Sequence, residues 1–326
     1  MFKLARYIAN HNRPIAESDA GASNQRVALL LAGGDGTRLQ ELTREVTGVP
    51  IPKQYCRLLH GRSLLEATLS RVNGFTSPKR TMAIVNQDHL ALARDQLRSL
   101  PESSILVQPF NRDTGPGMIF ALSQIARTYP NATVAVFPTD HYIDDDHTFM
   151  AHVLRATCVI STFPDKIALL GIVPDRPETA YGYIMPAQPL QTTRTPWSVF
   201  HVEVFREKPD TATAQDLIAR GGLWNTFVMV FQAYRMLELL KALAPPESAQ
   251  LFELPASPDE VARLYRGLTP WNFSTRVLAR IPEHLIILKV DDVHWNDWGT
   301  RESVERTYRH LNLVPAWQQT SAISAC

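Results

Sequence analysis

The sequence has few cysteines and almost no net charge. Its 326 residues contain three cysteines, Cys56, Cys158 and Cys326, which are widely spaced and form no CxxC or paired-histidine zinc pattern. This usage argues against a disulfide framework and favours reduced thiols in the cytoplasm. A formal net charge of +1 provides no broad basic field for binding nucleic acid. Any anion-binding site must therefore be small and local.

The chain also lacks a long apolar segment. The N-terminus is polar throughout, and the longest apolar run near it, Val27–Ala32, is much shorter than a secretory signal or a membrane span requires. Residues 1–25 predict a flexible N-terminal arm and residues 312–326 a C-terminal tail, because both are rich in small and polar residues. No repeat or low-complexity linker lies between them. We therefore expect one domain over residues 26–311, with no membrane partner and no nucleic-acid partner.

Short apolar runs alternate with helix-period segments in the first half of that domain. The runs that predict strands are Val27–Leu31, Met82–Val85, Ile105–Val107, Val134–Phe137 and Ile167–Val173. The helical patterns between them are Leu64–Val72, His89–Leu100 and Gly117–Tyr129, the first of which begins with a capping box from Ser63 to Glu66. This alternation predicts an α/β fold with a Rossmann-like, mostly parallel sheet flanked by helices.

The rhythm changes after Val173. Strand-like runs follow at Val199–Arg206, Thr226–Phe231 and Leu285–Val290, and helical patterns at Ala212–Arg220, Ala233–Leu243 and Arg301–Leu311. We expect a smaller inserted sheet and C-terminal helices in this half.

A glycine-rich loop follows the first predicted strand in the sequence LLLAGGDGTRL. Gly33, Gly34 and Gly36 lack side chains, so the backbone can take positive φ angles and bring its N–H groups close to phosphate oxygens. Arg38 and, fifteen positions later, Lys53 add cations suited to a triphosphate. The loop alone would also fit a tight turn without a ligand. The sequence has no GxxxxGK[ST] motif, and the missing third glycine of the dinucleotide fingerprint disfavours a nicotinamide-dependent dehydrogenase.

A series of motifs extends this pattern. AGGDGTRL followed by PKQY resembles the signature of the sugar-1-phosphate nucleotidyltransferases. Six later segments resemble that family in the same order: QPFNRDTGPGM, FPTDHYI, ETAYGYI, FREKP, LWNTFVMVF and WNDWGT. The similarity covers about residues 26–305 and is greatest to the mannose-1-phosphate guanylyltransferases. It divides the domain into a nucleotide half, about 26–165, and a sugar-binding half, about 166–311.

The resemblance implies transfer of a nucleotidyl group to a sugar 1-phosphate, with release of pyrophosphate. GTP and mannose 1-phosphate are the implied substrates and Mg²⁺ the implied cofactor. Two alternatives stay open: UTP or dTTP with glucose 1-phosphate, and a non-catalytic relative that binds sugar nucleotides and regulates a partner. The oligomeric state is also open, with a homodimer as one candidate.

The resemblance also implies roles for particular residues. The implied catalytic cations are Arg38, Lys53 and Lys208. The implied nucleotide-binding residues are Ala32, Gly33, Gly34, Gly36, Thr37, Gln108, Asn111, Arg112, Asp113 and Thr114. The implied sugar-binding residues are Glu178, Tyr181, Gly182, Glu207 and Asn225. The implied metal ligands are Asp140 and Asp297, since Mg²⁺ prefers carboxylates together with phosphate oxygens.

Simpler interpretations compete for several of these residues. Asp140 could cap a turn, and Glu207 with Lys208 could be a solvated ion pair. We interpret Asp144, Asp145 and Asp146 as favourable charge at the start of a helix over Phe149–Ile160. The neighbouring histidines, His141, His147 and His152, are interpreted as surface or packing residues, and the tryptophans Trp224, Trp295 and Trp298 as core or pocket walls.

Three departures from the family pattern affect these expectations. The connection from Arg38 to Lys53 is longer than the family's usual spacing, which leaves open whether this lysine reaches the site as it does in the family. Ala180 replaces a glycine beside the sugar. The segment Thr269–Arg280 lacks the acidic residues that the family carries there.

Overall fold

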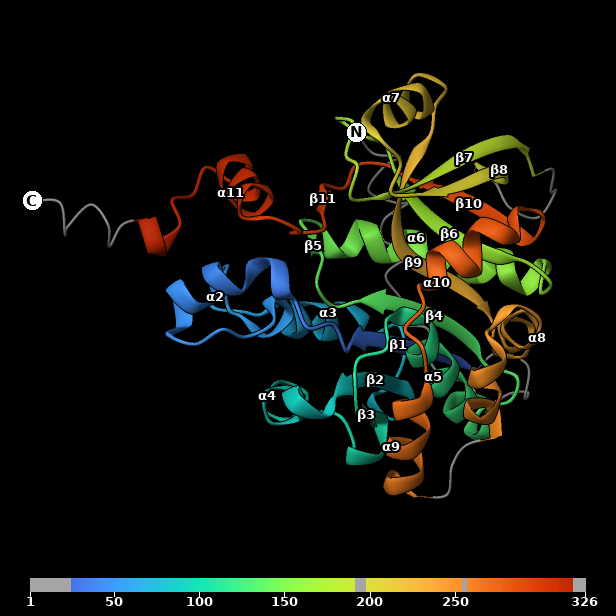
Figure 1. The fold of residues 1–326 in the computed structure, drawn as a ribbon. Helices are drawn as coiled ribbons and strands as arrows, with labels where there is room; N and C mark the ends of the chain where they lie inside the picture. The colour runs from blue at the N-terminus through green and yellow to red at the C-terminus, as the bar shows by residue number, and fades with distance from the viewer. Residues whose placement is uncertain (1–24, 191–197, 254–256, 319–326) are drawn as a thin grey trace, which may run out of the picture.

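The computed structural model describes residues 25–190, 198–253 and 257–318. The first 24 residues of the expected arm and residues 319–326 of the expected tail lie outside this part. One nine-stranded sheet, in the order β3-β2-β1-β4-β9-β6-β10-β8-β7, forms the centre of the domain (Figure 1). Its strands are Arg26–Ala32 (β1), Thr81–Asn86 (β2), Ile105–Gln108 (β3), Thr133–Pro138 (β4), Ile167–Ile172 (β6), Gly182–Pro189 (β7), Val199–Glu207 (β8), Leu223–Gln232 (β9) and Leu285–Val290 (β10).

The two halves of the sheet differ in strand direction. The pairs β3–β2, β2–β1 and β1–β4 are all parallel, as the sequence predicts for the nucleotide half. In the second half only β6 and β10 are parallel, and β9 runs antiparallel between β4 and β6. β7 pairs with both β8 and β9, so β9, β6, β10, β8 and β7 close into a ring. The smaller sheet that we expected is therefore continuous with the main sheet, and the parallel arrangement is confined largely to the first half.

Helices cover both faces of the sheet. Alternate strand residues point to opposite sides, and the residues on both sides are apolar. On β1, Ala28 and Leu30 belong to one apolar cluster and Val27 and Leu29 to another. The first cluster includes residues of the helices Leu64–Val72 (α3), Leu90–Gln96 (α4), Asp146–Thr162 (α6) and Thr211–Ala219 (α7). The second includes residues of the helices Thr114–Thr128 (α5), Ala233–Leu243 (α8), Pro258–Gly267 (α9) and Phe273–Arg276 (α10).

Local signals fix the starts of several helices. Ser63 and Glu66 form the predicted capping box of α3. The side chain of Asp145 accepts a hydrogen bond from the Thr148 N–H at the start of α6, so Asp145 and Asp146 lie at a helix start as expected, whereas the Asp144 carboxylate accepts from the His294 N–H. Asp146 has a further partner, because the buried Arg71 donates to it over 2.5 Å.

A third apolar cluster lies where the helices Gln40–Thr47 (α2) and Arg301–His310 (α11) meet (Figure 1). Trp317 packs here against the ring of Tyr308, with 5.1 Å between ring centroids. The first part of the expected tail is therefore packed on the domain. Nearby, the short strands Tyr142–Ile143 (β5) and Trp295–Asn296 (β11) pair and bring the segments after Asp140 and before Asp297 together. In the part of the chain that the structure describes, no helix is both long and apolar enough to cross a bilayer.

Candidate functional site

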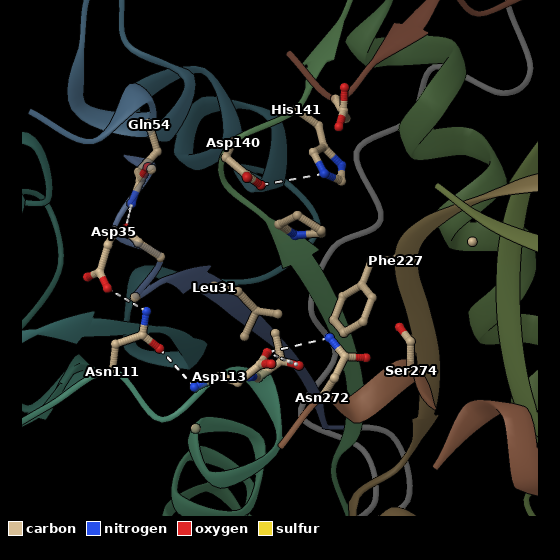
Figure 2. A pocket seen from close by; sticks show the side chains of 18 of the residues that line it. Leu31, Asp35, Gln54, Asn111, Asp113, Asp140, His141, Phe227, Asn272 and Ser274 are labelled. Carbon is tan, nitrogen blue, oxygen red and sulfur yellow. Dashed lines mark hydrogen bonds and ion pairs between the residues drawn. The ribbon is translucent and has the colours of Figure 1, made fainter. Parts of the chain in front are cut away.

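A cavity of about 630 Å³ lies beyond the carboxyl ends of β1, β3 and β4 (Figure 2). Parallel strands deliver their loops to one edge of a sheet, and ligands bind there in open α/β folds. The glycine loop and the loop after β3 line one end of the cavity. Residues of β7, β8 and β9 line the other end, so the cavity spans both halves of the domain.

The glycine loop is held in place by its neighbours. Gly36 has a φ of 58°, and a Cβ there would lie 3.0 Å from the backbone of Pro52 and Lys53. Gln54 donates to the Gly34 carbonyl over 2.7 Å, and the Tyr55 hydroxyl donates to the Ala32 carbonyl over 2.9 Å. The PKQY segment therefore holds the glycine loop through hydrogen bonds to its main-chain carbonyls. Of the three glycines, which all permit positive φ, only Gly36 adopts it, while a Cβ on Gly33 would lie 2.5 Å from the Gln108 amide.

The long connection between Arg38 and Lys53 forms a helix of its own, α2, which is followed by the capping residue Gly48 with a φ of 80°. Lys53 returns to the site but is 5% exposed and is absent from the cavity lining. Its ammonium lies 3.3 Å from the Asp140 carboxylate and donates to the main-chain carbonyls of Asp297 and Trp298. We expected Lys53 to face the triphosphate. Instead it joins the two segments that carry the expected metal ligands.

Asp140 and Asp297 both line the cavity. Burial opposes the charged form of Asp140, but the Lys53 ammonium and His141 hold the pKa of this carboxyl below its ordinary value. Asp297 accepts hydrogen bonds from the Tyr181 hydroxyl over 2.7 Å and from the Gly299 N–H over 2.8 Å, both at Oδ1. Burial and the Asp297 carboxylate together raise the pKa of Tyr181, which keeps it a hydrogen-bond donor.

These groups suit an oxygen-ligated cation such as Mg²⁺. The two carboxylates face the same cavity, and in the described residues no group of three or more His, Cys, Asp or Glu side chains could enclose a metal alone. Mg²⁺ commonly takes one or two carboxylates and completes its shell with water and substrate phosphates. The carboxylates of Asp140 and Asp297 fit this coordination preference.

The end of the cavity where a nucleotide base is expected, called the base end below, contains polar side chains from the loop after β3. Gln108 is 3% exposed, and Asn111, Asp113 and Thr114 line the cavity beside it. Asp113 has a φ of 64°, and its carboxylate caps α5 by accepting from the Thr114 N–H over 2.6 Å. Arg112, which we expected to bind nucleotide, is not part of the lining, because its guanidinium donates to the Tyr265 carbonyl over 2.8 Å.

The segment that departs from the family pattern lies against this loop. The Gly115 N–H donates to the Trp271 carbonyl over 3.1 Å, and the Phe273 N–H donates to the Thr114 hydroxyl over 2.9 Å. These bonds place Asn272 and Ser274 in the cavity lining, where Figure 2 shows Asn272 beside Asp113. Neither residue was among the expected site residues, although both belong to the segment Thr269–Arg280 that departs from the family pattern.

The end of the cavity where a sugar is expected is built from β7, β8 and β9. Gly182, Glu207, Lys208 and Asn225 line it, and a Cβ at Gly182 would lie 2.8 Å from the Glu207 carboxylate. Burial raises the pKa of Glu207, with the Lys208 ammonium 3.7 Å away opposing the rise. Glu178 is absent from the lining, because its carboxylate accepts from the Ala180 N–H over 3.3 Å and lies 3.6 Å from Arg176.

The structure therefore brings most of the expected residues to one cavity. The expected residues in its lining are Gly33, Gly34, Gly36, Arg38, Gln108, Asn111, Asp113, Thr114, Asp140, Tyr181, Gly182, Glu207, Lys208, Asn225 and Asp297. Ala32, Thr37, Lys53, Arg112 and Glu178 are not in it. His141, interpreted as a surface or packing residue, does line the cavity, with its ring edge-on to Trp295 at 5.1 Å.

A glycine loop after β1, two aspartates and several polar side chains line one cavity at the edge of an α/β sheet. The chain belongs to the nucleotidyl transferase family, whose model matches residues 27–312.

Known relatives agree with this assignment. The chain is 36% identical over 220 residues to a xanthan biosynthesis protein, XanB, of Xanthomonas campestris, and the match covers 67% of this chain and 44% of that protein. It is 34% identical over 229 residues to mannose-1-phosphate guanylyltransferase of Escherichia coli, covering 69% of this chain and 46% of the relative. The chain thus spans less than half the length of these curated relatives. The crystal structure of mannose-1-phosphate geranyltransferase from Thermus thermophilus superposes with a TM-score of 0.75 at 28% identity, covering 87% of this chain and 79% of that one.

Proposed function

We propose that this protein transfers a nucleotidyl group from a nucleoside triphosphate to a sugar 1-phosphate and releases pyrophosphate. One observation carries the proposal: a single cavity joins an open glycine loop, two aspartates and the polar pocket of Glu207, Lys208 and Asn225. Attack of a sugar phosphate on the α-phosphorus requires two polyanions to be held together and their charge to be neutralised. This cavity offers groups of those kinds from both halves of the domain.

The cations of the cavity would act at different ends. Arg38 lines the cavity near Asp297, since its Nη1 atom lies 2.9 Å from the position of a Cβ on Gly299. Among the residues that the structure describes, no carboxylate forms a salt bridge with Arg38, so its guanidinium is free to meet charge on the leaving pyrophosphate. Lys208 has a side chain that is 60% exposed and would hold the incoming sugar phosphate.

Mg²⁺ would be held by Asp140 and Asp297, and when bound it would neutralise phosphate charge. Lys53 would keep these two carboxylates at a fixed separation. Glu207 and Asn225 would accept and donate hydrogen bonds to sugar hydroxyls, with Gly182 leaving space for the ring.

GTP and mannose 1-phosphate are the proposed substrates, on the strength of the similarity to proteins with those names. Purified protein should be tested against a matrix of nucleoside triphosphates and hexose 1-phosphates, with pyrophosphate release as the readout. We expect GTP with mannose 1-phosphate to give the highest kcat/KM, by about tenfold or more, because each buried polar group left unpaired by a wrong substrate costs about 1–3 kcal/mol.

Other outcomes of this matrix would revise the proposal in different ways. A preference for UTP or dTTP with glucose 1-phosphate would keep the reaction and change the substrates. Binding of sugar nucleotides without pyrophosphate release under any condition would contradict the reaction itself and favour a regulatory relative.

A further inference from the structure

A chain of polar side chains runs beside the base end of the cavity. Gln108 donates from Nε2 to Oδ1 of Asn86 over 2.9 Å, and Asn86 donates from Nδ2 to Oδ1 of Asp35 over 2.9 Å. On the other side, Asn111 donates from Nδ2 to Oδ2 of Asp35 over 2.8 Å (Figure 2). Gln108 and Asn86 are each 3% exposed. Protein partners rather than bulk water therefore set the direction of these amides.

Asp35 determines which way every bond in this chain points. A carboxylate can only accept hydrogen bonds, whereas an amide has a donor end and an acceptor end. Asp35 therefore requires Asn86 to turn its amide nitrogen toward it. The side chain of Asn86 then presents its carbonyl oxygen to Gln108, so Gln108 must donate from Nε2.

The amide oxygen of Gln108 is the last atom of this hydrogen-bonded series. Within the described part of the molecule, this buried Oε1 atom has no hydrogen-bond partner, and Gln108 lines the cavity. The side chain lies between two glycines, since a Cβ on Gly33 would be 2.5 Å from Nε2 and a Cβ on Gly117 would be 3.1 Å from Oε1. A buried acceptor without a donor costs about 1–3 kcal/mol, so a ligand that supplies the donor gains that amount.

We propose that Asp35 is a positioning residue that holds Gln108 with its amide oxygen toward the nucleotide, and thereby selects bases with a ring N–H. Guanine, hypoxanthine, uracil and thymine carry such a group on their pairing edge. Adenine and cytosine present an unprotonated ring nitrogen at that place, which would set two lone pairs against each other. This inference rests on the proposed function, because it assumes that the base of a nucleoside triphosphate occupies this end of the cavity.

The test is a comparison of GTP, ITP and ATP with mannose 1-phosphate held in excess. ITP shares the ring N–H of GTP without its amino group, so wild-type protein should use GTP and ITP better than ATP. Asp35→Asn keeps the shape of the side chain but adds a donor, which allows Asn86 and Gln108 to reverse. We expect the ratio of kcat/KM for GTP to that for ATP to fall by about tenfold or more, since one matched hydrogen bond is lost and one repulsion removed.

Two further variants distinguish a reversal of the Gln108 amide from a general loss of activity. Asp88→Asn makes the same chemical change at an exposed position just after β2 and should leave the ratio unchanged. Adding Gln108→Glu to Asp35→Asn moves the carboxylate to the other end of the chain and again forces an acceptor toward the base. This double variant should recover discrimination against ATP.

The results that would overturn the inference are distinct from failure of the proposed function. An unchanged ratio in Asp35→Asn, including an equal loss with all three nucleotides, would show that Asp35 does not control the direction of Gln108. If the wild-type protein releases no pyrophosphate, calorimetric binding of GDP and ADP still decides the matter. Loss of GDP preference in Asp35→Asn would support the inference, and its retention would overturn it.

Discussion

Lys53 makes the expected metal site depend on one side chain that is not itself a metal ligand. Its ammonium contacts Asp140 directly and holds the backbone at Asp297 through a carbonyl. The resemblance implies Asp140 and Asp297 as metal ligands from the motifs FPTDHYI and WNDWGT, and both residues do line the cavity. It could not predict the bridge, since residues 53, 140 and 297 meet only in the folded sheet.

At the residue scale, we predict that Asp140→Asn and Asp297→Asn each lower kcat by about a hundredfold or more, because a bound metal contributes several kcal/mol to such reactions. Asparagine keeps the Oδ1 acceptor that Tyr181 and Gly299 use at Asp297, so the fold should persist. Pyrophosphate release and circular dichroism measure the two effects. EDTA should stop the wild-type reaction and Mg²⁺ should restore it. Activity that is indifferent to both the substitutions and the chelator would remove the metal assignment.

Arg112 and Glu178 mark the limit of prediction at this scale. Both lie in motifs whose other members line the cavity, but both side chains turn to protein partners instead. A motif fixes which residues share a loop. The direction of each side chain depends on backbone angles and on distant partners such as Tyr265, which the sequence does not place.

At the scale of elements, α5 and the segment before α10 form one unit. A Cβ on Gly115 would overlap the indole ring of Trp271, which packs directly against the start of α5. We predict that Gly115→Ala lowers the free energy of unfolding by about 1–3 kcal/mol, as overpacking commonly does. It should also raise the KM for the nucleotide, because Asn272 and Ser274 are placed in the cavity by the same contact.

Gly267→Ala is the matched control for this experiment, since no atom lies within 4 Å of a Cβ at that position. Urea unfolding and steady-state kinetics of the two variants would decide the question. Equal behaviour of the two alanine variants would mean that Trp271 can move without disturbing the site.

Elements with local signals were the ones that the sequence predicted well. The bounds of α3 match the prediction because the capping box and the apolar period both lie within the helix. β7 was missed, since its sequence GYIMPAQP contains two prolines that argue against a strand. Its partners on β8 and β9 stabilise it through contacts that no local pattern records.

At the scale of the whole molecule, Glu207 links the site to overall stability. Burial raises the pKa of Glu207 above its ordinary value of 4.5, so the folded state disfavours the charged form. The contribution of the protonated group is fully present below about pH 4.5 and is lost as the pH rises through the raised folded value. Glu207→Gln cannot ionise and should therefore gain stability relative to wild type as the pH rises, while losing affinity for the sugar phosphate.

Urea unfolding from about pH 4 to about pH 8 would measure this difference, the range in which a raised carboxyl pKa is crossed. Glu203→Gln on the same strand is the matched control because its side chain is exposed to solvent. A Glu207→Gln variant that is no more stable than wild type at any pH would show that burial does not penalise this carboxylate.

The position of β9 has a consequence for how the chain folds during synthesis. β4 pairs with β1 on one side, but its other neighbour is β9, which leaves the ribosome only after the 84 residues that separate Pro138 from Leu223. β6 also pairs with β9, so this edge of β6 stays unpaired until β9 has been synthesised. A nascent chain therefore carries one unpaired edge on β4 and two on β6, whose other partner β10 is made later still, for several seconds at a synthesis rate of about 5–20 residues per second. During that interval the apolar edge of β4 is open to pairing with another chain, so successful folding depends on how well such encounters are prevented.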